Sequence, residues 1–353
     1  MTDLTAPVLD AAGLARTISE MDFRDCVATV VGYGLMGKEY VKALRALGVR
    51  QIRVCGRRPE RLADLQGEAG VEVVSGGFEK LTLKPQPGEL GIIAVPIAEL
   101  IPAAEHLANL GFRRLMIEKP VSLWSEQIDS LADRLVGQGV EAVCAYNRVA
   151  YPAFYEVAAR AAREDGITSC TYTFTEMIRP DWTERFSLEE LARWGIANSM
   201  HVISMAHGLI GLPAEWWGHQ ARESHIAWHA AGAVFVGSGT SEAGVPFAYH
   251  ADWGSTGRWS VEVHTAVASY LLCPMETVQR RSKPLGAWEE VPLASFEPDV
   301  KPGILEQVAV FLGALETSFT SNLTTAARLT AYGEQVFGYA SQREGDRSFP
   351  GGL

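Results

Sequence analysis

Between Cys26 and Asn147 the chain alternates short apolar runs with longer stretches of helical spacing. The continuous apolar runs suit strands that are buried on both faces, and they span residues 26–32, 51–56, 71–76, 89–96, 113–120 and 140–147. The stretches between them repeat apolar residues at helical spacing and end in glycine, and they span residues 38–48, 59–70, 98–111 and 125–139. This alternation predicts right-handed crossovers and a doubly wound parallel sheet of the α/β class.

After Asn147 strands and helices no longer alternate. Helical spacing marks residues 151–165, 193–211, 304–317 and 324–342, whereas β-type runs fill residues 169–177, 227–239, 245–253, 258–274 and 275–282. Strands that follow one another between helices predict an α+β domain around a largely antiparallel open sheet. We therefore expect an N-terminal extension with one short helix (1–23), a first domain (24–147) and a second domain (148–353).

Composition narrows the class of protein. A chain of 353 residues suits two domains, and a net charge of −11 argues against nucleic acid or an anionic membrane as the partner. The five cysteines are scattered and odd in number, which predicts reduced thiols in a cytoplasmic protein. The first residues lack an apolar core behind a basic start, and no apolar run approaches about 18 residues, so we expect neither a secretory signal nor a membrane span.

A glycine motif stands where the first predicted strand turns into the first predicted helix. Gly32, Gly34 and Gly37 form the pattern G-x-G-x-x-G. In this context the first glycine permits a tight turn, the second lets a pyrophosphate approach the backbone, and the third lets the helix pack on the strand. The helix N-terminus adds free N–H groups for the phosphates. The predicted dinucleotide contacts of this Rossmann-type loop are Gly32, Tyr33, Gly34, Leu35, Met36 and Gly37.

The end of the second predicted strand bears on the choice of cofactor. NAD sites usually place an acid there, about 20 residues after the glycine loop, to hold the ribose 2′-hydroxyl. Here Arg57 and Arg58 follow the strand and no acid stands at the expected place. Because a guanidinium matches a 2′-phosphate in geometry and charge, we predict a preference for NADP. The alternative is that both arginines are solvated surface charges and that the site accepts NAD.

The motif Glu118-Lys119-Pro120 ends the fifth predicted strand. Together with the glycine loop, it resembles the glucose–fructose oxidoreductase / inositol dehydrogenase / MocA (Gfo/Idh/MocA) family. The segments AYNRVAYPAF, HADWGSTGRWSVEVHT and KPGILEQVAVFL are also similar to family segments. The resemblance implies a Rossmann domain followed by an α/β domain whose open sheet often mediates oligomers. It also implies hydride transfer between nicotinamide and a carbinol carbon of a sugar, nucleotide sugar or polyol.

The resemblance further implies roles for single residues. Lys119 corresponds to the family lysine that hydrogen-bonds the reacting oxygen, and Pro120, which in many members follows a cis bond, helps to aim it. Val95 and Pro96 stand where the family's fourth-strand loop lies along the nicotinamide ribose, and Glu118 is expected at the cofactor. An ammonium beside a nicotinium ring and a substrate hydroxyl would stabilise a developing alkoxide, and its positive surroundings would lower its pKa.

The apolar segment RWGIANSMHVISMAHGLIG, which contains no acid, occupies the position of the family's catalytic helix. Family members usually carry an acid, three residues, a histidine, two residues and a second acid there. Aligning His201 with that histidine puts Ala197 and Ser204 where the acids stand. Asn198 and Ser204 would share a helical face with His201, Asn198 as a contact for substrate or imidazole and Ser204 as an acceptor for the ring N–H. We therefore predict Lys119 and His201 as the proton-transfer pair.

Four residues beyond the last strand of the first domain are candidate substrate contacts. Arg148 and Tyr151 are expected near the interdomain cleft, where they would suit an oxygen-rich or anionic substrate. Glu176 and Arg179 are further candidates, with surface charges as the alternative interpretation.

The remaining histidines are not expected to do chemistry. His207 is six residues from His201, about 240° around a helix, so we expect it to be structural. His225 and His229 are four apart, but their segment looks strand-like and has no obvious third ligand, so we predict no metal site.

The sequence thus favours an NAD(P)-dependent oxidoreductase that acts on CH–OH groups of a small carbohydrate-like substrate. The missing helix carboxylates leave open a redox-neutral lyase or glycosidase that uses a retained cofactor. A third hypothesis is a catalytically inactive, nucleotide-binding regulator, against which Lys119 argues. The expected assembly is a homodimer or homotetramer formed through the C-terminal sheet.

Overall fold

The computed structural model describes residues 8–221, 226–297, 299–314 and 321–339. Its first sheet is six-stranded, in the order β3-β2-β1-β4-β5-β6, and every pairing is parallel. The strands are β1 (Val27–Val31), β2 (Gln51–Gly56), β3 (Val71–Ser75), β4 (Leu90–Ile93), β5 (Arg114–Glu118) and β6 (Glu141–Ala145). The predicted doubly wound sheet is therefore confirmed. From its centre, β1, β2 and β3 follow one another toward one edge, and β4, β5 and β6 toward the other.

Helices connect these strands at the expected places, with one exception. The connections include α2 (Leu35–Ala46), α3 (Ile97–Leu110) and α4 (Ser125–Gly137), with a short 3₁₀ turn at Phe78–Lys80. The helix predicted over residues 59–70 is wrong: only a 3₁₀ helix forms, η1 (Pro59–Leu65). Gly67 and Gly70 both have positive φ, 81° and 79°, so the backbone turns out of the right-handed helical region before a longer helix can form.

The second sheet has eight strands, in the order β14-β13-β12-β11-β7-β10-β9-β8. They are β7 (Ser169–Phe174), β8 (Pro213–Ala221), β9 (Val234–Ser241), β10 (Pro246–Asp252), β11 (Trp259–His264), β12 (Ala268–Leu272), β13 (Gln279–Ser282) and β14 (Glu289–Glu290). Only the β7–β10 pair is parallel, so the predicted, largely antiparallel sheet is confirmed. The edge strand β8 was not predicted, because its tryptophans and glycine do not alternate with polar residues.

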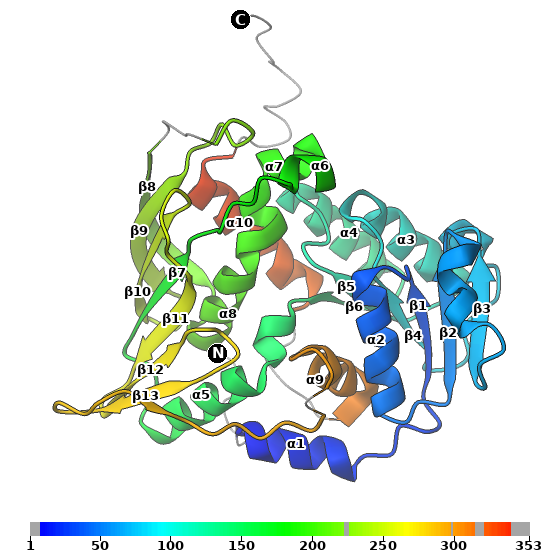
Figure 1. Ribbon diagram of the computed structural model, residues 1–353, viewed down its shortest axis with the longest axis horizontal. Helices are drawn as coiled ribbons and strands as arrows, with labels where there is room; N and C mark the ends of the chain where they lie inside the picture. Colours follow the sequence, from blue (N-terminus) through cyan, green and yellow to red (C-terminus); the bar gives the residue numbers. More distant parts are fainter. Residues whose placement is uncertain (1–7, 222–225, 298, 315–320, 340–353) are drawn as a thin grey trace, which may run out of the picture.

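The helices of the second half lie between the two sheets and around them, with α6 and α7 at the top of the view in Figure 1. They are α5 (Pro152–Arg163), α6 (Trp182–Arg185), α7 (Leu188–Ala192), α8 (Met200–Ile210), α9 (Ile304–Ala309) and α10 (Leu323–Phe337), with η3 (Asn147–Ala150) and the π-helical turns η4 (Gly195–Ser199) and η5 (Val310–Ala314). Within the described ranges, no helix is long and apolar enough to cross a membrane. The buried apolar side chains form one continuous core across both halves.

The N-terminal extension forms the one short helix that was predicted, α1 (Ala11–Glu20). Asp10 caps it by accepting a hydrogen bond from the Gly13 backbone, and its apolar face buries Leu14 and Ile18. The Ala11 backbone N–H donates to the Glu156 carboxylate on α5. The helix therefore packs against the second half of the chain, below α5 in Figure 1.

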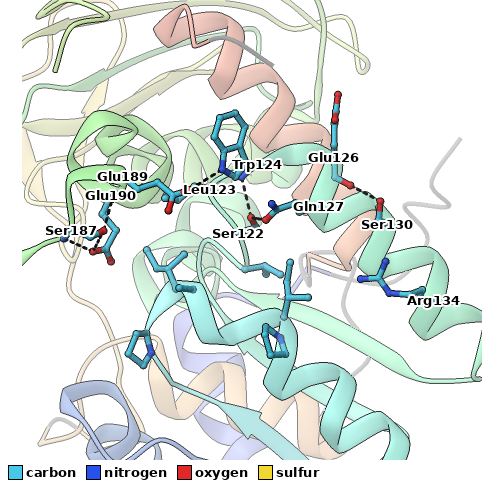
Figure 2. Close-up of a pocket in the computed structure, with 16 residues that line it drawn as sticks. Ser122, Leu123, Trp124, Glu126, Gln127, Ser130, Arg134, Ser187, Glu189 and Glu190 are labelled. Carbon is cyan, nitrogen blue, oxygen red and sulfur yellow. Dashed lines mark hydrogen bonds between the residues drawn. The ribbon is translucent and has the colours of Figure 1, made fainter. Parts of the chain in front are cut away.

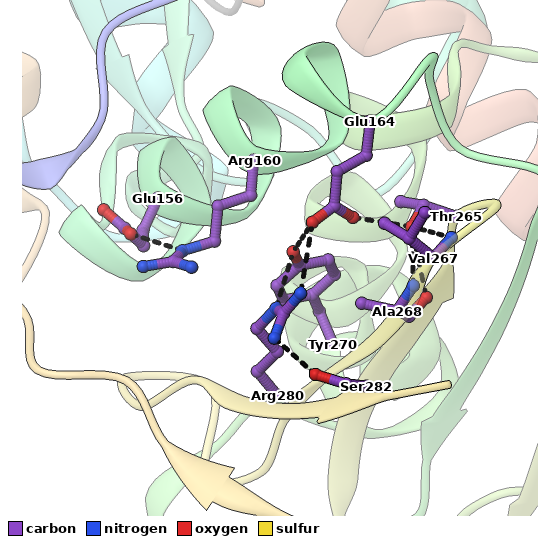
Figure 3. A network of polar contacts seen from close by, with 9 residues as sticks. All are labelled: Glu156, Arg160, Glu164, Thr265, Val267, Ala268, Tyr270, Arg280 and Ser282. Carbon is purple, nitrogen blue, oxygen red and sulfur yellow. Dashed lines mark hydrogen bonds and ion pairs between the residues drawn. The ribbon is translucent and has the colours of Figure 1, made fainter. Parts of the chain in front are cut away.

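A polar network holds the end of α5 against the second sheet (Figure 3). The Glu164 carboxylate accepts hydrogen bonds of 2.6 Å from the hydroxyls of Thr265 and Tyr270, and the Arg280 guanidinium lies 3.6 Å from it. Desolvation opposes its charge, yet these three partners together lower the pKa of Glu164 below its usual value. The network fixes α5, and so the loop before it, relative to β12 and β13.

The C-terminal part of the chain returns to the first half and closes it. Helix α9 packs beside α2, and Gln307 on α9 donates to the Tyr40 hydroxyl on α2 at 3.1 Å. Helix α10 packs on α4. Its Glu334 forms an ion pair with the buried Arg193. The region between the two sheets is therefore enclosed by segments far apart in sequence.

Candidate active site

The glycine loop has the shape that a dinucleotide phosphate site requires. Gly32 has a φ of 97°, and a Cβ there would lie 2.4 Å from the Ala94 carbonyl oxygen. A Cβ on Gly37 would lie 1.9 Å from the Gly32 carbonyl oxygen, whereas one on Gly34 would meet no protein atom within 4 Å. The first and third glycines are thus required by packing, and the second faces open space at the N-terminus of α2. This space fits a pyrophosphate.

A cavity of about 460 Å³ continues from this loop along the carboxyl ends of β1, β2 and β4. Arg57 and Arg58, the two arginines that follow β2, line it, and Arg61, which the sequence reasoning missed, lines it as well. Arg57 forms a 2.9 Å ion pair with Glu99 on α3. Arg58 and Arg61 are exposed, so the cavity offers cationic groups at the end where an adenosine ribose would lie. Val95 and Pro96 line the same cavity.

A second cavity, of about 630 Å³, adjoins the first and shares Pro96 and Pro102 with it. It lies between α3, the start of α4 and α7 (Figure 2). Trp124 borders it, with its indole N–H donating to Glu189 at 3.1 Å. Its polar lining is mostly engaged in such local contacts. Lys119 and His201 do not line it, so the larger cavity is separate from the candidate chemistry.

Lys119 leaves the carboxyl end of β5 at the junction of the two halves. The Lys119–Pro120 peptide bond is cis, as the family resemblance implied. The Lys119 Nζ donates to the Ala197 carbonyl oxygen at 2.8 Å, which links β5 to the π-helical turn η4. Burial lowers the pKa of Lys119 to about 8, with the Arg148 guanidinium acting in the same direction. The amine can therefore exchange a proton near neutral pH.

The side chain of Glu118, the residue before Lys119, is hydrogen-bonded within the protein. Its carboxylate accepts a 2.6 Å hydrogen bond from the Tyr40 hydroxyl, and burial raises its pKa. Val121, on the other side of the cis bond, has a φ of 68°, which is rare for a β-branched residue. Its backbone N–H bonds the Glu118 carbonyl at 3.0 Å and so closes the turn that carries Lys119. A strained turn held by buried partners is typical of a functional site.

The π-helical turn before α8 binds a carboxylate from another segment, and α8 itself has none. Glu176, just beyond β7, is 3% exposed. Its two oxygens accept hydrogen bonds from Asn198 Nδ2 at 2.9 Å and from Ser199 Oγ at 2.6 Å. Burial raises the pKa of Glu176 to about 7, although these hydrogen bonds and the Lys119 charge oppose the shift. Glu176 was only a further candidate from sequence, and the extra residue of the π-turn, which aims Asn198 at it, leaves no sequence signal.

His201 lies in the first turn of α8 and is 8% exposed. Its ring faces Arg148, whose Nη1 lies 2.8 Å from Nδ1 and 3.1 Å from Nε2. Burial lowers the pKa of His201 well below its ordinary value, and the charges of Arg148, Lys119 and Lys301 add to the effect. The imidazole is therefore neutral at physiological pH. Arg148 and His201 are brought together as neighbours, which their separation in sequence did not indicate.

Other predicted contacts differ from expectation. Tyr151 is buried, and its hydroxyl donates to Glu276 at 3.2 Å, so its ring rather than its hydroxyl faces Arg148. Ser204 was expected to accept the ring N–H of His201, but its hydroxyl donates to the His201 backbone carbonyl at 3.3 Å, as serines inside helices often do. Arg179 is exposed and paired with Asp181 at 3.2 Å, which fits the surface interpretation.

His207 and His229 are held in the core. His207 bonds the Gly211 carbonyl at 2.9 Å and faces the Tyr172 hydroxyl at 3.3 Å, and burial lowers its pKa to about 4. His229 is engaged by the Gly232 carbonyl and the Tyr339 hydroxyl, at 2.7 and 2.6 Å. His225 lies outside the described residues. In the part of the chain that the structure describes, no group of three metal-ligating side chains occurs.

Lys301 is a site residue that the sequence reasoning missed. It precedes α9, and its Nζ lies 3.5 Å from the Met36 sulfur at the start of α2. It is also close enough to Glu118 and His201 to affect their pKa values. A lysine from the C-terminal segment therefore stands between the glycine loop and the candidate catalytic groups. Its one sequence signal is that it begins the family-like segment KPGILEQVAVFL.

Comparison with protein families finds a match for the first part of the chain. The family model for shikimate / quinate 5-dehydrogenases matches residues 13–118, which run from α1 to the end of β5. It covers less than half of the chain. A comparison with curated proteins gives no significant match.

Many solved structures share the whole fold. UDP-N-acetylglucosamine 3-dehydrogenase GnnA from Acidithiobacillus ferrooxidans is 16% identical with a TM-score of 0.65, covering 88% of this chain and 96% of its own. An NAD binding oxidoreductase from Klebsiella pneumoniae is 16% identical with a TM-score of 0.70, covering 90% and 97%. Levoglucosan dehydrogenase, solved with NADH and L-sorbose, is 17% identical with a TM-score of 0.67, covering 89% and 96%. The chain therefore has the two-sheet fold of Gfo/Idh/MocA-type NAD(P)-dependent oxidoreductases, as its sequence motifs predicted.

Proposed function

We propose that this protein is an NAD(P)-dependent oxidoreductase that acts on a CH–OH group of a sugar, nucleotide sugar or polyol. The observation that carries the proposal is the position of Lys119. Its buried amine, with a pKa lowered to about 8, stands at the end of β5 between the glycine loop and α8. The printed activities of similar folds, a nucleotide-sugar dehydrogenase and levoglucosan dehydrogenase, support the same class of substrate.

The cofactor residues fit a dinucleotide. The backbone of the loop from Gly32 to Gly37 would hold the pyrophosphate, since Gly34 leaves open space at the N-terminus of α2. Arg58 and Arg61 would face the adenosine ribose, which supports NADP as the preferred cofactor. When bound, the nicotinamide supplies the acceptor or donor of the hydride. All proton movement is left to the side chains.

Lys119 is the group we assign to proton transfer. In its neutral form it accepts the proton of the substrate hydroxyl during oxidation, and in its charged form it returns the proton during reduction. The amine is already oriented by its hydrogen bond to the Ala197 carbonyl. Burial and a neighbouring guanidinium keep its pKa near neutrality.

His201 is assigned to the substrate oxygen as a neutral partner. The Arg148 Nη1 lies 2.8 Å from Nδ1 and 3.1 Å from Nε2, so it donates to one ring nitrogen and the other carries the hydrogen of the neutral ring. That ring N–H would donate to the reacting oxygen and hold it toward Lys119. The depressed pKa of His201 keeps the ring in this form. Asn198 in η4 and the Glu176 carboxylate that it contacts complete the site. Glu176 would replace the helix carboxylates of the family pattern.

The assignment of Lys119 is tested with a panel of free sugars, nucleotide sugars and polyols, assayed in both directions with NADP and NAD. Lys119→Met is expected to lower kcat by about 10²- to 10⁴-fold on the best substrate, because it removes the proton acceptor. Lys84→Met, an exposed lysine remote from the glycine loop, is the matched control. Cofactor affinity, followed by fluorescence, should survive in both variants. Undiminished turnover in Lys119→Met would refute the assignment.

The assembly follows from the same resemblance. We propose a homo-oligomer formed through the open face of the second sheet. Trp216 on β8 packs inward against Tyr332 on α10, so its neighbour Trp217 points to the opposite face, where it is 68% exposed. A large apolar side chain left uncovered on a sheet is suited to an interface between copies of the chain.

A further inference from the structure

The Arg148 guanidinium is a partly buried positive charge with no carboxylate paired to it among the residues that the structure describes. Its hydrogen bonds go to the Asn147 side-chain oxygen at 2.8 Å and to the His201 ring. Its Nε is buried and has no partner. Burial lowers the pKa of Arg148, which reflects the cost of keeping the charge there. Buried charges in proteins are normally paired, so this arrangement calls for an anion from outside the chain.

Aromatic rings leave the guanidinium in place but do not neutralise it. The Tyr151 and Trp259 ring centres lie 5.7 and 5.6 Å from its central carbon. Trp259 also lies 5.8 Å from the His201 ring, so Arg148, His201 and Trp259 form one cluster. Rings against a guanidinium favour its retention, while its donor edge stays available. The indole supplies an apolar surface of the kind that sugar rings stack on.

Charges of both signs surround the cluster. Lys119 and Lys301 act on His201 from β5 and from the segment before α9. The acids that influence Arg148 are Glu276, Glu118 and Glu176. Each already accepts hydrogen bonds from other side chains: Glu276 from Tyr151, Glu118 from Tyr40, and Glu176 from Asn198 and Ser199. Among the described residues, none of these acids forms an ion pair or a hydrogen bond with Arg148, whose bonds go to Asn147 and His201.

We propose that Arg148 binds a carboxylate of the substrate, so that the enzyme acts on an anionic carbohydrate such as a hexuronate or an aldonate rather than on a neutral sugar. The inference rests on the proposed oxidoreductase function and names its substrate class. A carboxylate matches the planar donor edge of a guanidinium. Bound there, it would place its neighbouring carbinol carbons beside His201, whose ring contacts Arg148 and lies close enough to Lys119 to feel its charge.

The experiment compares substrates that carry a carboxylate with counterparts that carry a neutral hydroxymethyl group at the same position. Initial rates are measured for hexuronates against the hexoses of the same stereochemistry, for aldonates against the corresponding polyols, and for sugar phosphates as a third arm. We expect kcat/KM for the best carboxylate to exceed that of its neutral counterpart by about 100-fold, since a charged hydrogen bond is lost in the neutral compound. Arg148→Gln should abolish this ratio, mainly by raising KM, and Arg148→Lys should keep part of it.

Controls separate this proposal from the general one. Arg328→Gln removes an exposed arginine paired with Glu242 and should leave the ratio unchanged. Turnover of neutral sugars with no gain for acids, a preference for sugar phosphates, or an unchanged ratio in Arg148→Gln would overturn the carboxylate site but not the oxidoreductase. Failure of every arm would instead reject the oxidoreductase proposal.

A second measurement does not depend on the variants folding. In the wild-type protein, a non-reacting sugar carboxylate should compete with the substrate about 100-fold more strongly than its amide, which has the same shape but no charge. Equal inhibition by the acid and the amide would contradict an anion site at Arg148 even if Arg148→Gln cannot be purified.

Discussion

Glu176 supplies an acid to a helix whose own sequence has none. The segment around His201 carries no acid, yet a carboxylate reaches it from the end of β7 and is held by Asn198 and Ser199. Because Glu176 is buried, its pKa rises to about 7, so it changes charge in the same pH range as Lys119. The two groups influence each other, and the state of one sets the proton affinity of the other.

This coupling gives a prediction for pH dependence. Oxidation should rise with pH as the Lys119 ammonium, with a pKa of about 8, loses its proton. The Glu176 carboxylate raises the pKa of Lys119, so Glu176→Gln should lower it and move the rising limb of kcat/KM to lower pH. The matched control is Glu242→Gln, an exposed acid, which should leave the profile in place. An unshifted profile with normal thermal stability would mean that Glu176 is only structural.

Sequence reasoning reached some of these residues and not others, for physical reasons. Lys119 was found because its neighbours Glu118 and Pro120 form a contiguous motif. The pairing of Arg148 with His201 was not, since nothing in a single sequence records which side chains meet across a cleft. Lys301 was missed for the same reason. Glu176 was named but could not be ranked, because its burial depends on how β7 ends against η4.

At the scale of elements, the glycines in the loop between β1 and α2 have different roles. Gly37→Ala would place a methyl group 1.9 Å from the Gly32 carbonyl oxygen, a backbone atom that cannot easily move. We expect a loss of about 3 kcal/mol or more in unfolding free energy, measured by chemical denaturation. Gly34→Ala, with no protein atom within 4 Å of the new methyl, should fold normally and instead weaken cofactor binding. Equal stability of the two variants would contradict this division.

The elements themselves were largely predictable where periodicity was strong. All six parallel strands were located, since each is a continuous buried run. The segment after Pro59 was overpredicted because its leucines are spaced as in a helix, while Gly67 and Gly70 stop the backbone from continuing. The π-turn before His201 was also beyond prediction, since the residues of η4 fit an ordinary helix equally well.

At the scale of the whole molecule, the uncovered face of the second sheet leads to a prediction about assembly. Trp217→Glu should shift the protein toward the monomer, because it places a charge in the proposed interface. Size-exclusion chromatography with light scattering measures the change. Val136→Glu, a substitution of an exposed apolar residue on α4, is the control and should have no effect. A wild-type protein that is already monomeric at assay concentration would contradict the proposal.

The return of the chain to β6 has a consequence for dissecting the protein. The Cys144 backbone N–H bonds the Ser321 carbonyl at 2.8 Å, and Val143 pairs with Asn322, so residues just before α10 cover the outer edge of the parallel sheet. A fragment cut after residue 147 would expose that strand edge as well as the surfaces of α2 and α4 that α9 and α10 cover. Such an edge templates pairing with other chains. The half that contains the parallel sheet is therefore not expected to fold as an independent unit, and expressing it alone should favour aggregation.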